Sequence, residues 1–357
     1  MIVNYNIQSE FDTLRSLYSS DWYLPKYVDA ELVGKIINSL KRGKSPGPDG
    51  VGTEHIIYAH PIVTSIVVIL FNWVLLCGRV PSSFCYTYTV PIPKGSDSVN
   101  RLRSTKDFRG ISISSLFSKM FESCLLDIFA NWLVTEENQF GFKEGLGCSH
   151  AIYLANCFSN ALIDGGDTVN IVALDVAKAL PTVNRHALLI KLMKRNCPAS
   201  FIDLIGNWLF HSESCVKWCN CLSFYYSFRT GVNQGSVLAP ALFALFMNDL
   251  IIKCNKSDLG MILVYADDIL LITRTRRNLQ EMFDMVQFEL VWLNLCLNVD
   301  KCVSMHVGAR HGTPCVPLFT LDRCHISEVK EIRYLGIFMV SGNSMRCSLD
   351  HAKRGFF

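Results

Sequence analysis

Three aspartates have the residue type and setting to hold metal ions if the fold brings them together. Asp267 and Asp268 are adjacent within LVYADDILLI (263–272), which is otherwise apolar, and Asp175 ends the run NIVALD (170–175). Burying a carboxylate costs free energy unless it is paired or bound to a metal. Clustered acids repel one another, divalent cations relieve that repulsion, and oxygen ligands suit Mg²⁺. Two such ions roughly 3.5–4 Å apart can activate a hydroxyl and stabilise a leaving pyrophosphate.

The local sequence pattern predicts the elements that carry these acids. Residues 170–175 have strand character, and the apolar runs on either side of Asp267 and Asp268 predict a β-hairpin with the pair at its tip. Because Asp is a favoured turn residue, a plain turn explains the pair equally well when it is taken alone. If the strand end and the hairpin tip are sheet neighbours, however, all three carboxylates meet at one edge of the sheet.

The remaining elements alternate without the regular rhythm of a doubly wound fold, which favours an α+β domain with a mostly antiparallel sheet. The run IVTSIVVILFNWVLLC (62–77) is too short and too polar to span a bilayer, so a buried helix is expected there. Residues 96–110 are polar and predict a loop. The pattern predicts helices over 29–41, 54–77, 114–133, 149–163 and 278–295, strands over 86–96 and 224–228, a Gly-rich turn leading into a helix that ends near 251, and a strand at EIRYLGIFM.

Composition favours a packed globular protein over a disordered one. Of the 357 residues 50% are hydrophobic and only 18% are charged, and the net charge of +3 is too small to indicate nucleic-acid binding by itself. The 15 cysteines are scattered and no signal-peptide pattern precedes them, so free thiols are expected in a chain that is not secreted and works in the cytoplasm, the nucleus or both. No zinc site is expected, because the densest group (Cys215, Cys219 and Cys221) lacks a fourth ligand.

An ordered set of motifs resembles the reverse transcriptases of non-LTR (LINE-like) retrotransposons. YADD follows an apolar run, LDVAKA precedes it as a strand end, and GVNQGSVLAPALFALFMNDL lies between the two. YADD alone is a weak signal, but the whole set occurs in the order of that family over about residues 28–340. Its other members are KSPGPDGVGTEHI, PIPKGS, KDFRGISISSLFSKMFE, NQFGFKEGLGCSHAI, LNVDKC and YLGI.

The resemblance implies the fingers and palm of a right-hand polymerase, with a small antiparallel palm sheet backed by helices and a truncated thumb. It implies an RNA-directed DNA polymerase that transfers a dNTP to a primer 3′-hydroxyl on an RNA template. The boundaries that it implies are an N-terminal segment at 1–27, fingers with the start of the palm at 28–165, palm at 166–343, the start of the thumb at 344–357, and a reverse transcriptase domain over about 74–343.

The resemblance also assigns roles at the metal site. It implies that Asp175, Asp267 and Asp268 are the ligands of two Mg²⁺ ions, with Mn²⁺ as a substitute, and that the Val176 carbonyl adds a backbone oxygen. Lys301 would protonate the leaving pyrophosphate, since a positioned ammonium can act as a general acid.

Five further residues are assigned to the incoming nucleotide. Lys94 and Arg109 would clamp its triphosphate, for which an arginine fork is well suited. Gln234 and Gly235 would begin the helix under the nascent base pair, where glycine permits close approach of the backbone. Leu180 occupies the position of an aromatic residue that blocks a ribose 2′-hydroxyl in the family.

Three departures from the family pattern suggest a weakened enzyme. Leu180 should discriminate less sharply against ribonucleotides, Pro181 replaces a second acid and should reroute the helix beyond the metal site, and Gly110 replaces a proline in the triphosphate loop. Two alternatives therefore stay open: a catalytically inactive nucleic-acid-binding remnant, and a maturase-like RNA-binding splicing factor.

Overall fold

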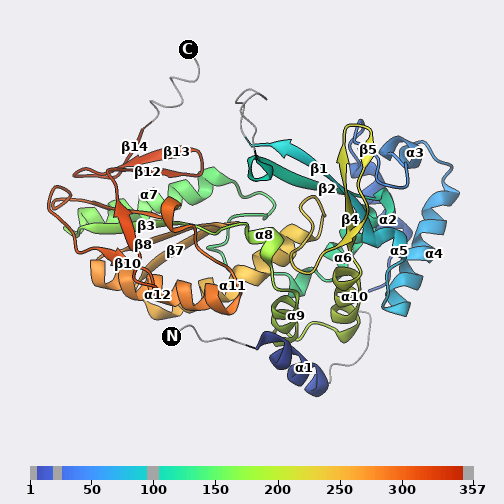
Figure 1. Ribbon diagram of the computed structural model, residues 1–357, viewed down its shortest axis with the longest axis horizontal. Coiled ribbons are helices and arrows are strands. Elements are labelled where there is room, and N and C mark those ends of the chain that lie inside the picture. Colours follow the sequence, from blue (N-terminus) through green and yellow to red (C-terminus); the bar gives the residue numbers. More distant parts are fainter. Residues whose placement is uncertain (1–5, 19–25, 95–103, 349–357) are drawn as a thin grey trace, which may run out of the picture. The chain divides into compact units, whose positions relative to one another are not determined.

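The computed structural model describes residues 6–18, 26–94 and 104–348, which form two compact units (Figure 1). Each unit is assembled from two separate stretches of chain. The fingers and palm boundaries given above stay a prediction, and residues 349–357 of the expected thumb lie outside the described residues. The first unit comprises Met1–Val134 and Leu180–Leu242, and the second comprises Thr135–Ala179 and Phe243–Phe357.

Helices dominate the first unit. Asp29, the residue predicted to begin a helix, accepts a hydrogen bond from the Leu32 N–H at 2.8 Å and caps α2. The unit contains α1 (Ile7–Leu17), α2 (Ala30–Ser39), α3 (Thr53–Ile57), α4 (Ile62–Cys77), α5 (Ser82–Cys85), α6 (Leu116–Ile128), α9 (Arg185–Lys194) and α10 (Ala199–Phe210), while α8 (Ala179–Thr182) and α11 (Ala239–Ser257) include residues of both units.

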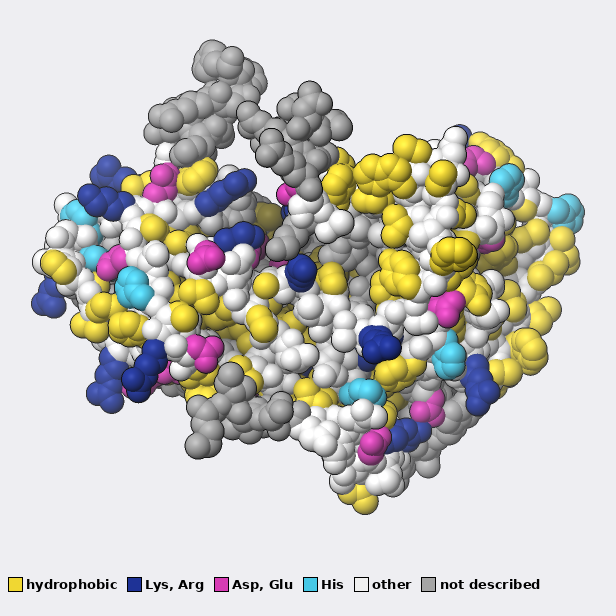
Figure 2. Space-filling model, viewed as in Figure 1, with side chains coloured by type: hydrophobic (Ala, Val, Ile, Leu, Met, Phe, Trp, Pro, Cys, Tyr) yellow, Lys and Arg dark blue, Asp and Glu magenta, His cyan; other side chains and the backbone are white. Residues whose placement is uncertain are grey.

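The single buried helix predicted over 54–77 is wrong in two respects. The chain forms α3 and α4 separately, because Pro61 lacks an N–H for a continuous helix and instead precedes the first turn of α4. Only one face of α4 is buried, through Val67, Phe71, Val74 and Leu75. On the opposite face five large apolar side chains are exposed, namely Ile62, Ile66, Ile69, Trp73 and Leu76. Figure 2 shows hydrophobic surface over this helix.

A small sheet completes the first unit. Strand β1 (Tyr86–Pro93) pairs antiparallel with β2 (Phe108–Ser114) and parallel with β4 (Glu213–Trp218), which also pairs with β5 (Cys221–Leu222) and β6 (Tyr226–Ser227). The sequence prediction missed β2, because it read 96–110 as a polar loop and began the next helix at 114. The ladder with β1 stabilises this polar segment as a strand, which a local pattern does not reveal.

The half-buried strand predicted over 224–228 is also wrong in extent. Only Tyr226 and Ser227 pair with β4, and Phe224 is 96% exposed. Tyr225 packs edge-on against Tyr86 with ring centroids 5.3 Å apart, and Tyr226 packs against Phe228 at 5.4 Å. The aromatic cluster at 224–228 therefore reflects contacts between surface rings more than burial.

The second unit is built on a six-stranded sheet with the order β10-β11-β9-β3-β8-β7. All its neighbouring pairs are antiparallel except β11 and β9, in agreement with the mostly antiparallel sheet predicted. The strands are β3 (Val169–Asp175), β7 (Gly260–Tyr265), β8 (Asp268–Thr273), β9 (Val303–Val307), β10 (Leu318–Phe319) and β11 (His325–Glu328), and a separate three-stranded sheet contains β12 (Glu331–Tyr334), β13 (Ile337–Val340) and β14 (Arg346–Ser348).

Helices cover both faces of the six-stranded sheet. Helix α7 (Cys148–Asp164) lies on one face and α12 (Arg276–Trp292) on the other (Figure 1). Ala151, Ala155 and Leu162 of α7 share a core with Ile171 of β3 and with apolar residues of β7, β8 and β9. This packing fixes the central strands β3 and β8, of which β3 ends and β8 begins at the predicted metal site.

Two further expectations concern the chain as a whole. All 15 cysteines lie within the described residues and are free, as predicted. Among the described residues, no helix is both long enough and apolar enough to span a membrane.

Candidate metal centre and nucleotide contacts

The sheet brings the three predicted acids to one edge. Asp175, the last residue of β3, lies directly opposite Asp268, the first residue of β8, and Asp267 precedes Asp268 in the hairpin turn. Side chains directly opposite in an antiparallel pair have Cβ atoms only about 4.5–5.5 Å apart. The adjacency expected from the sequence is thus present, while the assignment of these acids as metal ligands stays a prediction.

The hairpin that presents two of the acids has a two-residue turn. Tyr265 pairs with Asp268, so Ala266 and Asp267 are its central residues, and of the two only Ala266 has a positive φ, of 58°. This is the pattern of a type II′ turn, which fits the twist of a hairpin and in which the first position is usually glycine. Alanine holds this conformation because the flanking strands are fixed in the core.

Gly141 lies against that turn and was missed by the sequence analysis. The stretch 138–140 joins the edge of β7, with hydrogen bonds from the Val264 N–H to the Asn138 carbonyl (2.9 Å) and from the Phe140 N–H to the Val264 carbonyl (2.8 Å). A Cβ on Gly141 would overlap the Ala266 backbone nitrogen and lie 3.0 Å from the Tyr265 carbonyl carbon. The NQFGF motif was recognised, but the chain alone does not show which backbone it touches.

Mutual repulsion shapes the electrostatics of the acids. Partial burial of its carboxyl raises the pKa of Asp268 to about 6, and the charges of Asp267 and Asp175 act in the same direction. Lys301 opposes this effect, and its Nζ donates to Asp175 Oδ2 at 3.3 Å. Within the second unit, three acids therefore face one lysine, which is the charge imbalance that a divalent cation relieves.

The backbone near Asp175 supports the expected orientation of Val176. The Asn298 N–H donates to the Asp175 carbonyl at 2.9 Å, and the Ala177 N–H donates to the Cys296 carbonyl at 2.8 Å. Because successive backbone groups of a strand point to opposite sides, the Val176 carbonyl faces the β8 side, where Asp267 and Asp268 lie. The carbonyl would then lie on the same side as the acids, and oxygen donors of this kind suit a hard divalent cation.

In the first unit, Lys94 and Arg109 lie at the same end of the β1–β2 hairpin. The Lys94 N–H donates to the Asp107 carbonyl at 2.8 Å, Arg109 pairs with Ile92, and both cationic side chains are exposed. The hairpin therefore presents two cations at one end. Their role in binding a triphosphate stays a prediction.

Gln234 and Gly235 do not begin the helix, contrary to the prediction. They form a turn that precedes α11, which starts at Ala239, because Gly235 has a φ of +117° that no helix can include. The Gln234 carbonyl accepts from the Ser112 N–H of β2 at 2.7 Å, and a Cβ on Gly235 would overlap the Ser112 carbonyl. Glycine is thus required here by the approach of β2.

Glu122, a buried acid on α6 that the sequence analysis did not single out, fixes the residues after this turn. Its Oε2 accepts from Ser236 Oγ at 2.5 Å and from the Leu238 N–H at 2.7 Å. Burial raises the pKa of Glu122, while these hydrogen bonds lower it. The carboxylate therefore accepts hydrogen bonds that water would otherwise accept from Ser236 and Leu238. No local sequence pattern predicts this role of Glu122.

Replacing Glu122 by alanine is expected to lower the free energy of unfolding by about 2–3 kcal/mol, because the Leu238 N–H and Ser236 hydroxyl would lose their buried acceptor. Glu122→Gln keeps an acceptor oxygen and should cost less. Urea denaturation of the parent and the two variants measures their free energies of unfolding, which should fall in the order parent, Glu122→Gln, Glu122→Ala. Equal stability of the alanine variant and the parent would contradict the role of Glu122 as the buried acceptor.

Leu180 and Pro181 are tied to the segment that leads to Gln234. The Leu180 carbonyl accepts from the Val232 N–H at 3.1 Å, and the Pro181 carbonyl accepts from Thr230 Oγ1 at 3.1 Å. Helix α8 spans only four residues before α9 begins at Arg185. Pro181 lies within α8, and the rerouting expected from it, like the assignment of Leu180 to the ribose, stays a prediction.

A match to a protein-family model identifies the family of this chain. The family model described as reverse transcriptase (RNA-dependent DNA polymerase) matches residues 92–339, which is more than half of the chain. The chain belongs to the reverse transcriptase family. This match confirms the resemblance found in the sequence, and the motifs that carried it lie largely within the matched residues.

The similar curated proteins come from non-LTR elements. The chain is 27% identical over 322 residues to the Pol polyprotein of the type-2 retrotransposable element R2DM of Drosophila melanogaster, covering 85% of this chain and 29% of that protein. It is 26% identical over 348 residues to the RNA-directed DNA polymerase of the mobile element jockey of Drosophila funebris, covering 92% and 37%. This reverse transcriptase thus spans about a third of the length of these relatives.

A solved structure supports the fold class. Apo telomerase from Candida tropicalis, truncated of its C-terminal domain, superposes with a TM-score of 0.52 at 15% identity, over 80% of this chain and 60% of that one. The predicted α+β, right-hand polymerase fold is confirmed.

Proposed function

We propose that this chain is the RNA-directed DNA polymerase portion of a LINE-like retrotransposon protein. A primer 3′-hydroxyl attacks the α-phosphate of a dNTP and releases pyrophosphate, with RNA as the template. The observation that carries the proposal is the pairing of Asp175 with Asp268 at the open end of two central strands, with Asp267 in the adjoining turn. Family membership supports the same reaction, for which reverse transcriptases in general use divalent metal ions.

The proposal assigns the metal site and the proton donor to residues of the second unit. The carboxylates of Asp175, Asp267 and Asp268 and the carbonyl of Val176 hold two Mg²⁺ ions, or Mn²⁺ in their place. The bound ions supply Lewis-acid activation of the hydroxyl and charge stabilisation of the pyrophosphate. Lys301 keeps its ammonium beside Asp175 and donates a proton to the leaving group.

The first unit supplies the nucleotide contacts in the same proposal. Lys94 and Arg109 bind the triphosphate, and an arginine fork matches two phosphate oxygens. The Gln234–Gly235 turn, fixed by Ser112 on one side, lies under the base pair, and Leu180 faces the sugar. Fingers at 28–165, palm at 166–343 and a thumb from 344 are the division that the proposal adopts.

Primer extension on poly(rA) with oligo(dT), dTTP and Mg²⁺ tests the proposal. We expect incorporation that depends on the metal and falls by about 100- to 1,000-fold in Asp267→Asn, the range seen when one electrostatic contributor is removed. The exposed Asp322→Asn in the same unit is the matched control. Extension unchanged by Asp267→Asn would refute the assigned chemistry. Salt-sensitive RNA binding without extension would instead identify the nucleic-acid-binding remnant.

A further inference from the structure

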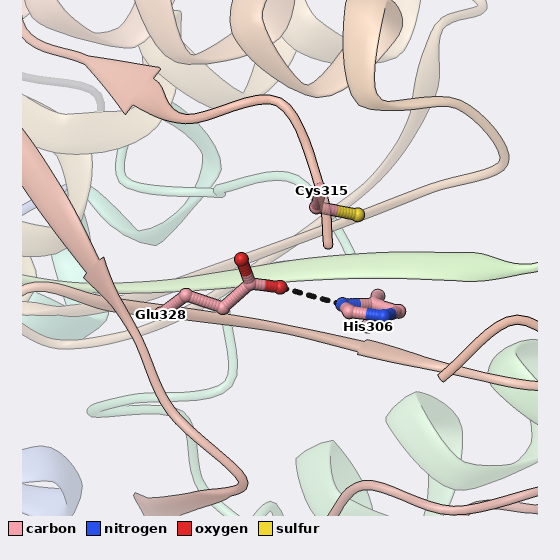
Figure 3. A group of neighbouring side chains, drawn as sticks. All are labelled: His306, Cys315 and Glu328. Carbon is pink, nitrogen blue, oxygen red and sulfur yellow. Dashed lines mark hydrogen bonds and ion pairs between the residues drawn. The ribbon is translucent and has the colours of Figure 1, made fainter. Parts of the chain in front are cut away.

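Three side chains of residue types that can bind metal lie close together in the second unit (Figure 3). His306 belongs to β9, Glu328 ends the neighbouring strand β11, and Cys315 comes from the loop between β9 and β10. One nitrogen, sulfur or oxygen from each residue lies within 4.8 Å of the others. Ligands of a tetrahedral Zn²⁺ are roughly 3.3–3.8 Å apart, as follows from bond lengths near 2.0–2.3 Å.

The hydrogen bonds of His306 already orient its ring for such a role. Nδ1 lies 2.6 Å from Glu328 Oε1, and Nε2 lies 3.1 Å from the Arg310 carbonyl. The Arg310 carbonyl can only accept, so Nε2 is the donor of that bond, and Nδ1 faces the Glu328 carboxyl, where a bound cation could join the two. A metal-bound histidine typically donates its other ring N–H to a backbone carbonyl, and the Arg310 carbonyl fills that role.

The charges around the cluster permit a divalent ion despite a nearby arginine. Burial lowers the pKa of Arg276, while the charges of Glu328 and Cys315 raise it. Burial and Glu328 raise the pKa of Cys315, so without a metal it is a neutral thiol. The thiolate of Cys315 and the carboxylate of Glu328 would together balance the two positive charges of a Zn²⁺ ion beside Arg276.

Arg276 also holds in place the loop that carries Cys315. Its Nε donates to the Val316 carbonyl at 2.8 Å, next to Cys315, and its Nη2 donates to Ser304 Oγ at 3.2 Å. Its buried Nη1 has no hydrogen-bond partner among the described residues.

We propose that His306 Nδ1, Cys315 Sγ and a Glu328 carboxylate oxygen bind one Zn²⁺ ion, with water as the fourth ligand. The nitrogen–sulfur–oxygen set favours zinc over magnesium, which prefers oxygen ligands. The site is distinct from the three acids, because His306 pairs with Asn170 at the far end of β3 from Asp175. Bound zinc joins the loop between β9 and β10 to the edge of the sheet, which is a structural role.

Metal titration of the full chain tests the proposal. After chelator treatment, wild-type protein should bind one Zn²⁺ tightly and unfold at higher temperature with zinc, since a ligand that binds only the folded state stabilises it. Co²⁺ should give the near-ultraviolet charge-transfer band of a cobalt–thiolate bond. Cys315→Ala should lose that band and weaken zinc binding by more than the roughly 10- to 100-fold typical for loss of a second-shell partner.

Cys324→Ala is the matched control, because Cys324 is an exposed thiol of the same unit outside the cluster, and it should behave as wild type. Glu328→Gln keeps the shape of the side chain and should also weaken zinc binding, which preserves the test if Cys315→Ala does not fold. A cobalt–thiolate band or zinc affinity that is the same in wild type and in the variants of Cys315 and Glu328 would overturn the proposal, as would wild-type protein that binds no zinc. Neither outcome depends on polymerase activity.

Discussion

Asp268→Asn is expected to abolish primer extension and at the same time raise the melting temperature of the metal-free protein at pH 7–8. In the folded chain the pKa of Asp268 is raised to about 6 from its ordinary value of 3.8. Between these two pH values the folded state holds a proton that the unfolded state has lost, so the free energy of unfolding falls as pH rises through this window. The amide removes the cost of burying a charged carboxyl and the repulsion from Asp267 and Asp175, and it also removes the metal ligand.

Thermal denaturation between pH 4 and pH 8, with and without Mg²⁺, measures both effects. The Asp268→Asn variant should be the more stable protein at pH 8 without metal, and the difference should shrink toward pH 4, where the parent carboxyl is protonated. Added Mg²⁺ should raise the melting temperature of the parent more than that of the variant. Asp322→Asn, which removes an exposed acid elsewhere in the unit, should leave both temperatures within experimental error. A parent that is more stable than the Asp268→Asn variant at pH 8 without metal would contradict the raised pKa of Asp268 and this prediction with it.

The acids could be predicted because each one is encoded locally. An apolar strand that ends in Asp175 and a hairpin tip with Asp267 and Asp268 are short-range patterns, and sheet pairing then leaves few arrangements. The same holds for α2, whose cap is a single side chain three residues from its partner N–H. Where the structure depends on residues close together in the sequence, the sequence alone was sufficient to predict it.

The errors arose where distant segments decide the structure. Strand β2 exists because β1 pairs with it, and the polar residues 104–110 do not indicate a strand by themselves. The exposed apolar face of α4 contradicts the ordinary rule that such residues are buried, so a hydrophobic run without polar alternation predicts burial incorrectly. Glu122 and Gly141 were missed for the same reason, since their partners are far away in the sequence.

Gly141→Ala is expected to destabilise the protein more than any other addition of one methyl group near the proposed metal site. The added Cβ would overlap the backbone nitrogen of Ala266 and press on the Tyr265 carbonyl carbon. These are backbone atoms of the turn that presents Asp267, so they cannot move aside as a flexible side chain does. Such overpacking costs about 1–3 kcal/mol. We expect the upper end of this range, because β7 and β8 hold both ends of the turn in the core.

The same substitution should reduce catalysis beyond its effect on folding. A displacement of about 1 Å at a reacting group can cost 100-fold in rate, and the turn moves away from Gly141 together with the carboxylate of Asp267. Primer extension well below the melting temperature of the variant separates this loss from unfolding. Gly147→Ala is the matched control, because no atom lies within 4 Å of the Cβ that it adds. Since Gly147 is the N-cap of α7 and alanine is a poorer cap than glycine, that control should cost about 0.5–1 kcal/mol and keep full activity. Equal activity of the folded Gly141 and Gly147 variants would mean that the position of the turn does not limit the reaction.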